Sequence, residues 1–209
     1  MKQMMKQSVS LLLALVLLMG LYVPAEAADK RTVDKVVEET AAYIHKVVDD
    51  PVVNSVGGEW AVLGLARSGA NVPQQYWNNY VKNVGKALQE VQGVAHRKKY
   101  TEYSRVILGL TSVGADPTNV AGYNLLTPLG DFDRTIWQGI NGPIWALIAL
   151  DTNGYSIPYN PNATRRATRQ MYINEILNRQ LTSGGWWHWD CREWNSHWYP
   201  ERSAPRWGR

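Results

Sequence analysis

The chain has 209 residues, of which 45% are hydrophobic, and a formal net charge of +4 at pH 7. This length is enough for one domain with a core of its own. The positive charge is too small and too scattered to indicate nucleic-acid binding. Cys191 is the only cysteine, which excludes an internal disulfide and leaves packing to hold the fold together.

The N-terminal segment has the pattern of an export signal. Lys2 and Lys6 precede a leucine-rich apolar run over residues 10–22, and a small-x-small site ends at Ala27. The run is shorter than the about 20 residues that a membrane-spanning helix needs, and no later stretch of sequence is long and apolar enough to span a bilayer. We expect residues 1–27 to be a cleaved signal peptide and the protein to be secreted or held at the cell surface. An uncleaved N-terminal anchor is the alternative.

Helical periodicity begins soon after this segment. Residues 33–48 carry apolar side chains at helical spacing, among them Val36, Val37, Ala41 and Ile44. This pattern predicts the first amphipathic helix, which we assign to an outer layer.

Three later segments repeat one pattern, an apolar run that ends in Leu-x-x-x-Gly. They cover residues 60–69, 105–114 and 145–154. Leu65, Leu110 and Leu150 occupy the same position in each segment, which gives a period of about 40 to 45 residues. A proline follows each glycine, at Pro73, Pro117 and Pro158. Each unit therefore predicts a buried helix, a glycine that ends it and a proline-led restart.

Amphipathic helices are predicted beside these apolar ones. They cover residues 76–91, with Tyr80, Val84 and Leu88 on one face, and residues 164–181. Because strand and hairpin signals are weak, the fold class is all-α. The alternation predicts buried inner helices covered by amphipathic outer ones.

The last predicted helix, over residues 169–179, runs into Gln180-Leu-Thr-Ser-Gly184-Gly185-Trp186. We expect the two glycines to end the helix, Gln180 to bond free backbone groups there, and Trp186 to offer a flat surface to the next element. This segment resembles the QW motif of the squalene–hopene cyclase and protein prenyltransferase superfamily. The resemblance implies that residues 28–186 form a partial α/α toroid, a ring of helical hairpins.

The stretch over residues 137–150 is also similar to exported bacterial toroid domains and to the helical domain of cobalamin carriers. Those families bind ligands and have no known catalytic residues there. The resemblance implies a cavity lined by aromatic side chains, and the candidates for ligand binding are Trp60, Tyr103, Trp137 and Trp145, with Tyr155 nearby. The alternative is that these rings fill the core between the layers.

Two enzymatic sites known from the superfamily are matched poorly. Terpenoid cyclases donate a proton from Asp-x-Asp-Asp, whereas this chain has Asp131-Phe-Asp133-Arg134, in which the arginine favours ionised carboxylates. We therefore expect Asp131 or Asp133 to cap a helix. Prenyltransferases hold zinc with Asp, Cys and His, but Cys191 lies in a compact cluster outside the repeats, and His45 and His96 are isolated. No catalytic residue, metal or cofactor is expected.

The last segment, residues 187–209, has a different composition. It holds half of the chain's 10 tryptophans but no Leu, Ile, Val, Met or Phe. We expect it to be a disordered tail, read out of frame after a disruption of the gene. The toroid would then be unclosed and would self-associate through its exposed edge. A Trp-rich tail that binds membranes or glycans is the alternative.

The function expected from these patterns is that of an exported, non-catalytic module that binds a small molecule, a glycan or a protein. The alternatives are a terpenoid cyclase or prenyltransferase relative, and a cobalamin-carrier-like domain. The latter rests on analogy of fold alone.

Overall fold

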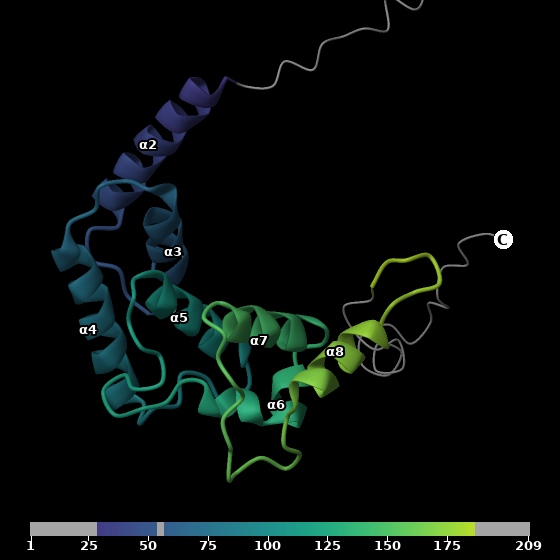
Figure 1. The fold of residues 1–209 in the computed structure, drawn as a ribbon. Coiled ribbons are helices and arrows are strands. Elements are labelled where there is room, and N and C mark those ends of the chain that lie inside the picture. The colour runs from purple at the N-terminus through teal and green to yellow at the C-terminus, as the bar shows by residue number, and fades with distance from the viewer. Residues whose placement is uncertain (1–28, 54–56, 187–209) are drawn as a thin grey trace, which may run out of the picture. The chain divides into compact units, whose positions relative to one another are not determined.

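The computed structural model describes residues 29–53 and 57–186 (Figure 1). Within these ranges the chain forms helices and isolated β-bridges but no strand, so the all-α prediction is confirmed. The chain divides into two compact units, residues 1–37 and 38–209. The predictions of a signal peptide over residues 1–27 and of an out-of-frame tail over residues 187–209 lie outside the described residues.

The elements follow one another in chain order with loops of varied length. They are α2 (Lys30–Val47), α3 (Glu59–Ser68), α4 (Gln74–Glu90), α5 (Thr101–Ser112), the 3-10 helix η1 (Thr127–Gly130), α6 (Phe132–Ile136), α7 (Asn141–Asp151) and α8 (Arg169–Leu177). The first predicted amphipathic helix is therefore present as α2, and the three apolar repeats are present as α3, α5 and α7.

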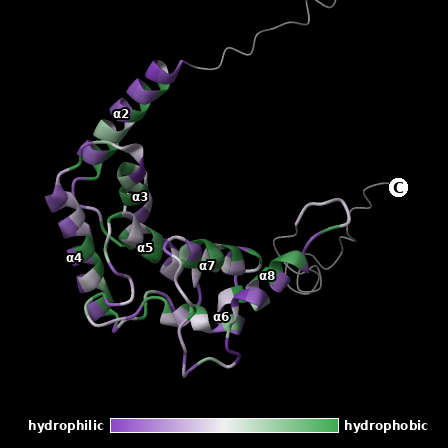
Figure 2. Ribbon diagram, in the orientation of Figure 1, coloured by the Kyte–Doolittle hydropathy of each residue, from purple (hydrophilic) through white to green (hydrophobic). Residues whose placement is uncertain are grey.

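The helices α3, α5 and α7 form a row, because α5 packs against both of the others. The repeated leucines Leu65, Leu110 and Leu150 are all buried at equivalent positions. Figure 2 shows α5 and α7 largely in the hydrophobic colour, as expected for helices enclosed on several sides. The three leucines thus lie in the core, on helices that pack side by side.

The glycine that ends each repeat adopts the left-handed conformation that glycine favours. The φ angles are 75° at Gly69, 77° at Gly114 and 64° at Gly154. In the second and third repeats, the residue after the glycine donates its N–H to the repeated leucine carbonyl, at 2.9 Å for Leu110 and 2.8 Å for Leu150. In the first repeat, the Ser68 hydroxyl donates to that carbonyl instead, at 2.8 Å. The three helix ends therefore share a left-handed glycine, while the bond to the leucine carbonyl comes from the main chain in two repeats and from a serine side chain in the first.

The amphipathic helix α4 turns one face to the same core. Its side chains Tyr80, Val84 and Leu88 are buried, as predicted, and polar residues occupy its other face. The Tyr80 hydroxyl reaches α5, where a Cβ placed on Gly109 would lie 2.4 Å from it. Glycine at this position is therefore what allows the tyrosine of α4 to cross the interface.

The regular alternation of inner and outer helices predicted from the sequence is interrupted between α5 and α7. Only the short elements η1 and α6 lie there, joined to α5 by a loop. Apolar side chains of this segment fill the core, namely Val120, Leu125, Leu126, Leu129 and Phe132. In this part of the fold, residues of a loop and of two short helices therefore cover the core, where the predicted alternation would place a long outer helix.

The predicted helix over residues 164–181 is wrong at both ends, since α8 covers only Arg169–Leu177. Before it, the main chain is extended and pairs with the segment that precedes α6. Ala167 N donates to Gly130 O at 2.9 Å and Phe132 N to Arg165 O at 3.0 Å. Thr168 then caps α8 by accepting from Met171 N. Long-range backbone pairing therefore delays the start of the helix.

The glycines of the QW-like segment do not end α8, which is a second correction. The Leu177 carbonyl accepts from the main-chain N–H of Gln180 at 3.0 Å. The chain then turns back on itself, with Leu181 N donating to Gly185 O at 2.7 Å and an isolated bridge between Gln180 and Trp186. Gly184 has a φ of 88° in this turn, so glycine is needed there for the turn and not for the helix end.

Candidate ligand-binding face

The three inner helices share a second set of equivalent positions, on the turn before the repeated leucines. These positions hold Trp60 on α3, Arg105 on α5 and Trp145 on α7. Although α5 lies between α3 and α7 in the row, the two indole rings meet, with centroids 5.4 Å apart and planes inclined by 57°. Trp60 remains 40% exposed and Trp145 is partly exposed. The row therefore carries an aromatic pair at the solvent.

The helix surface beside this pair is open. Gly64 lies one turn after Trp60, on the same face of α3. A Cβ at Gly64 would meet no heavy atom within 4 Å. On α7, Ile148 follows Trp145 by one turn and is an exposed apolar side chain. We call Trp60, Gly64, Trp145 and Ile148 the aromatic face. A ligand resting on it can approach the main chain of α3 closely.

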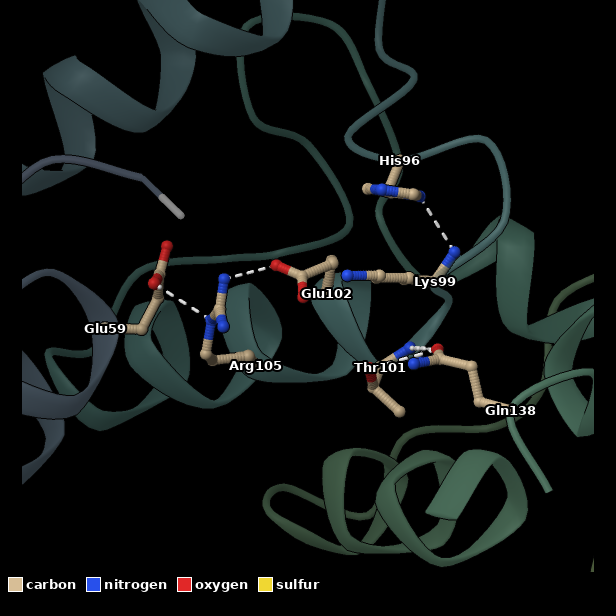
Figure 3. A network of polar contacts seen from close by, with 7 residues as sticks. All are labelled: Glu59, His96, Lys99, Thr101, Glu102, Arg105 and Gln138. Carbon is tan, nitrogen blue, oxygen red and sulfur yellow. Dashed lines mark hydrogen bonds and ion pairs between the residues drawn. The ribbon is translucent and has the colours of Figure 1, made fainter. Parts of the chain in front are cut away.

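The equivalent position of α5 carries a charge instead of an aromatic ring, at Arg105. The Arg105 Nε lies 3.1 Å from a carboxylate oxygen of Glu59, whose side chain is 1% exposed. The same guanidinium also pairs with Glu102, one turn earlier on α5 (Figure 3). Glu59 begins α3, where the helix dipole favours a negative charge. The arginine thus neutralises a buried carboxylate and joins α3 to α5.

Tyr80 of α4 interacts electrostatically with both members of this ion pair. Burial raises the pKa of the Tyr80 hydroxyl well above its ordinary value, and the negative charge of Glu59 raises that pKa further. The hydroxyl is therefore neutral at physiological pH. It is a packing group of the interface between α4 and α5, with none of the acidity that proton transfer would require.

Three of the predicted ligand-binding aromatics are not part of this face. Tyr103 is buried and packs edge-on against Tyr100, with centroids 5.3 Å apart. Tyr155 places its hydroxyl 3.1 Å from that of Thr111. Trp137 is 53% exposed but follows α6, where its ring contacts Lys98. Of the predicted set, only Trp60 and Trp145 are brought together.

The two aspartates of the cyclase-like segment form structural hydrogen bonds. Asp131 is the N-cap of α6, accepting from Arg134 N at 3.1 Å, so the capping prediction is confirmed for this residue. Asp133 does not cap. It accepts from Arg165 at 2.5 Å on the surface of the protein. Both carboxylates therefore lie beside arginines, Asp131 with the Arg134 Nε at 3.6 Å and Asp133 with Arg165.

The histidines within the described ranges serve local structure. His45 packs edge-on against Tyr76, with centroids 4.9 Å apart. The His96 Nδ1 accepts from the main-chain N–H groups of Lys98 and Lys99 at 3.0 and 2.8 Å (Figure 3). No group of three potential metal ligands occurs among residues 29–53 and 57–186. Cys191 lies outside the described residues.

Sequence reasoning missed Glu59, Gly64 and Ile148. The repeat itself could have identified Gly64 and Ile148, because each lies about one turn beyond a tryptophan at a repeated position. Glu59 gives no such signal, since its partner Arg105 is distant in the sequence.

None of the helices in the described part of the chain has the length and apolar character needed to cross a bilayer. Compared with known proteins, the chain matches no protein-family model, no curated protein and no solved structure.

Proposed function

We propose that this protein is an exported, non-catalytic binding domain of the α/α-toroid type, and that the aromatic face is where its ligand binds. The observation that carries the proposal is the contact between Trp60 and Trp145, which are partly exposed at equivalent repeat positions. Exposed tryptophans grouped on one surface more often mark a binding site than a packing requirement. The equivalent register of α3, α5 and α7 supports the toroid part of the proposal.

A glycan is the ligand class that this chemistry fits best. An indole ring offers a broad, flat apolar surface, which suits the apolar C–H face of a sugar ring. Arg105 and Glu102 remain 19% and 17% exposed at their side chains, so they can hydrogen-bond with hydroxyl groups at the edge of such a ring. Gly64 leaves the space that the sugar needs above α3.

The enzymatic alternative finds less support. Asp131 caps α6 and Asp133 pairs with Arg165, so both carboxyl groups of the cyclase-like segment already have structural partners. An export signal is also typical of binding modules that meet polymers of the cell surface.

The proposal is tested by calorimetric titration with soluble oligosaccharides that contain N-acetylglucosamine. We expect Trp60→Ala to weaken binding at least about tenfold, since hot-spot tryptophans contribute about 2 kcal/mol or more. We expect Gly64→Gln to block binding while the helix stays at least as stable, because glutamine is a better helix former than glycine.

Trp137→Ala is the matched control, since it removes an exposed tryptophan from another surface. Equal affinity of the wild type, Trp60→Ala and Gly64→Gln for these sugars would overturn the assignment of the aromatic face. Failure of the wild-type protein to bind any of these sugars would overturn the glycan class.

A further inference from the structure

A second surface lies on the loop that joins α4 to α5 and carries a concentrated positive charge. Arg97, Lys98 and Lys99 are consecutive and exposed. No acidic residue occurs between Glu90 and Glu102, so the loop has three positive charges and no negative one. The small net charge of the whole chain conceals this concentration.

Exposed apolar side chains accompany these cations. Val91 and Val94, in the same loop, are 47% and 45% exposed. Trp137 lies beside the loop, with the Lys98 Nζ 5.7 Å from its ring centroid. We call Val91, Val94, the cations of residues 97–99 and Trp137 the basic loop surface. It combines apolar, aromatic and cationic groups within one short stretch of the fold.

The loop is held in place by its own hydrogen bonds. Gly93, at a φ of 78°, donates its N–H to Leu88 O at 2.7 Å. The His96 side chain accepts from the main-chain N–H groups of Lys98 and Lys99. At the end of the loop, the Gln138 side chain accepts from Thr101 N at 3.1 Å, which ties the segment after α6 to the start of α5 (Figure 3). The surface is therefore formed before any partner binds, which lowers the entropic cost of binding.

We propose that the basic loop surface docks onto an anionic lipid bilayer. Lysine and arginine are attracted to anionic headgroups, and tryptophan favours the interface between headgroups and acyl chains. The two exposed valines decide between a bilayer and a soluble polyanion. A polyanion would contact the cations alone, whereas a bilayer also removes the valines from water.

The experiment is co-sedimentation of the full chain with vesicles of phosphatidylcholine, with or without phosphatidylglycerol. We expect binding only when phosphatidylglycerol is present. Lys98→Ala/Lys99→Ala should weaken that binding more than about tenfold, since each cation near an anionic surface contributes about fivefold. Lys82→Ala/Lys86→Ala is the control, because it removes the same charge from the exposed face of α4.

A second pair of substitutions tests the apolar part. Val91→Ser/Val94→Ser keeps every charge, and we expect it to weaken vesicle binding while leaving any binding to soluble polyphosphate unchanged. If this variant sediments with vesicles as the wild type does, charge alone accounts for the binding, and the argument that favours a bilayer over a soluble polyanion is wrong. If the wild type ignores phosphatidylglycerol vesicles, the proposal is wrong.

This surface shares no residue with the aromatic face, so the two proposals fail separately. Trp60→Ala should bind vesicles normally, and Trp137→Ala should bind glycans normally. Thermal unfolding followed by circular dichroism confirms that each variant is folded before it is compared.

Discussion

The inner helices α3, α5 and α7 each have a buried face and a partly exposed face, and packing restricts the residue type on the first more than on the second. On the buried face, the repeated position holds leucine three times, at Leu65, Leu110 and Leu150. On the partly exposed face, the equivalent position holds tryptophan, arginine and tryptophan. Because the buried position is packed against neighbours on several sides, it requires a side chain of the same size and shape in each repeat. The other face meets solvent, so its residues are free to differ and to carry function.

Arg105 belongs to the partly exposed face but stabilises a buried group. It occupies the position of a tryptophan in the other repeats, yet its partner Glu59 is buried. A carboxylate removed from water is stable only while a cation and hydrogen bonds compensate for the lost hydration. The face that is free to vary therefore contains one residue on which the fold depends.

The largest expected effect follows from breaking this pair. Arg105→Ala leaves the Glu59 carboxylate buried without its guanidinium, and we expect the free energy of unfolding to fall by about 3–5 kcal/mol. Urea denaturation measures it. The exposed pair of Arg169 and Asp151 is the control, and Arg169→Ala should change stability little.

The double variant Glu59→Leu/Arg105→Leu tests the explanation. It removes both charges and should recover much of the stability that Arg105→Ala loses. If Arg105→Ala is as stable as the wild type, the ion pair does not hold α3 and α5 together. The fold would then not depend on Arg105.

The next largest effect concerns the repeated leucines. Leu65→Ala, Leu110→Ala and Leu150→Ala should each lower the free energy of unfolding by about 2–5 kcal/mol, because each leaves a cavity in a packed interior. Urea denaturation of the three variants side by side tests their equivalence. A variant that loses less than about 1 kcal/mol would show that its helix is not an equivalent member of the row.

The parts of the fold that the sequence predicts well are those with local causes. The period of the leucines, the left-handed glycines after them and the amphipathic face of α4 all depend on neighbours within a few residues. The start of α8 was mispredicted because it depends on a distant partner. Residues 165–167 pair with the segment before α6, far away in the sequence, and this pairing prevents the helix from starting earlier.

The candidate site was predicted in part for the same reason. Trp60 and Trp145 are marked by their repeated register, but Tyr103 has the same chemistry and is buried. Residue type does not reveal which side of a helix faces the core when most of the helix is apolar. The partner of Glu59 and the openness at Gly64 depend on three-dimensional contacts, which the sequence does not display.

A smaller effect is expected at alkaline pH. Burial raises the pKa of Tyr80 and Tyr172 in the folded protein, so their contribution to stability is complete below the unfolded value of about 10. As pH rises above that value, the unfolded state ionises first and the contribution is lost. Each tyrosine should lower the free energy of unfolding by about 1.4 kcal/mol per pH unit there.

Urea denaturation at a series of pH values above neutrality measures this slope. Tyr80→Phe should make it shallower without costing stability at pH 7, since the Tyr80 hydroxyl has no hydrogen-bond partner among the described residues. Tyr172→Phe should also make it shallower but lower stability at pH 7, because its hydroxyl donates to Leu129 O at 2.5 Å. Equal slopes in wild type and variants would contradict this account.

The smallest effect compares two repeats at one equivalent position by adding one methyl group. Gly64 and Gly109 occupy equivalent positions, each directly before the repeated leucine. Gly64→Ala should raise the free energy of unfolding by about 0.5–1 kcal/mol, because alanine is the better helix former and its Cβ meets open space. Gly109→Ala has the same helical gain, but its Cβ would lie 2.4 Å from the Tyr80 hydroxyl.

The buried Tyr80 ring has no room to retreat, so overpacking of about 1–3 kcal/mol should outweigh the helical gain and lower stability overall. Paired urea titrations of the two variants measure the opposite signs. If both substitutions stabilise, the interface between α4 and α5 is looser than the geometry indicates. If both destabilise, the surface at Gly64 is already covered, and the aromatic face has no space for a ligand.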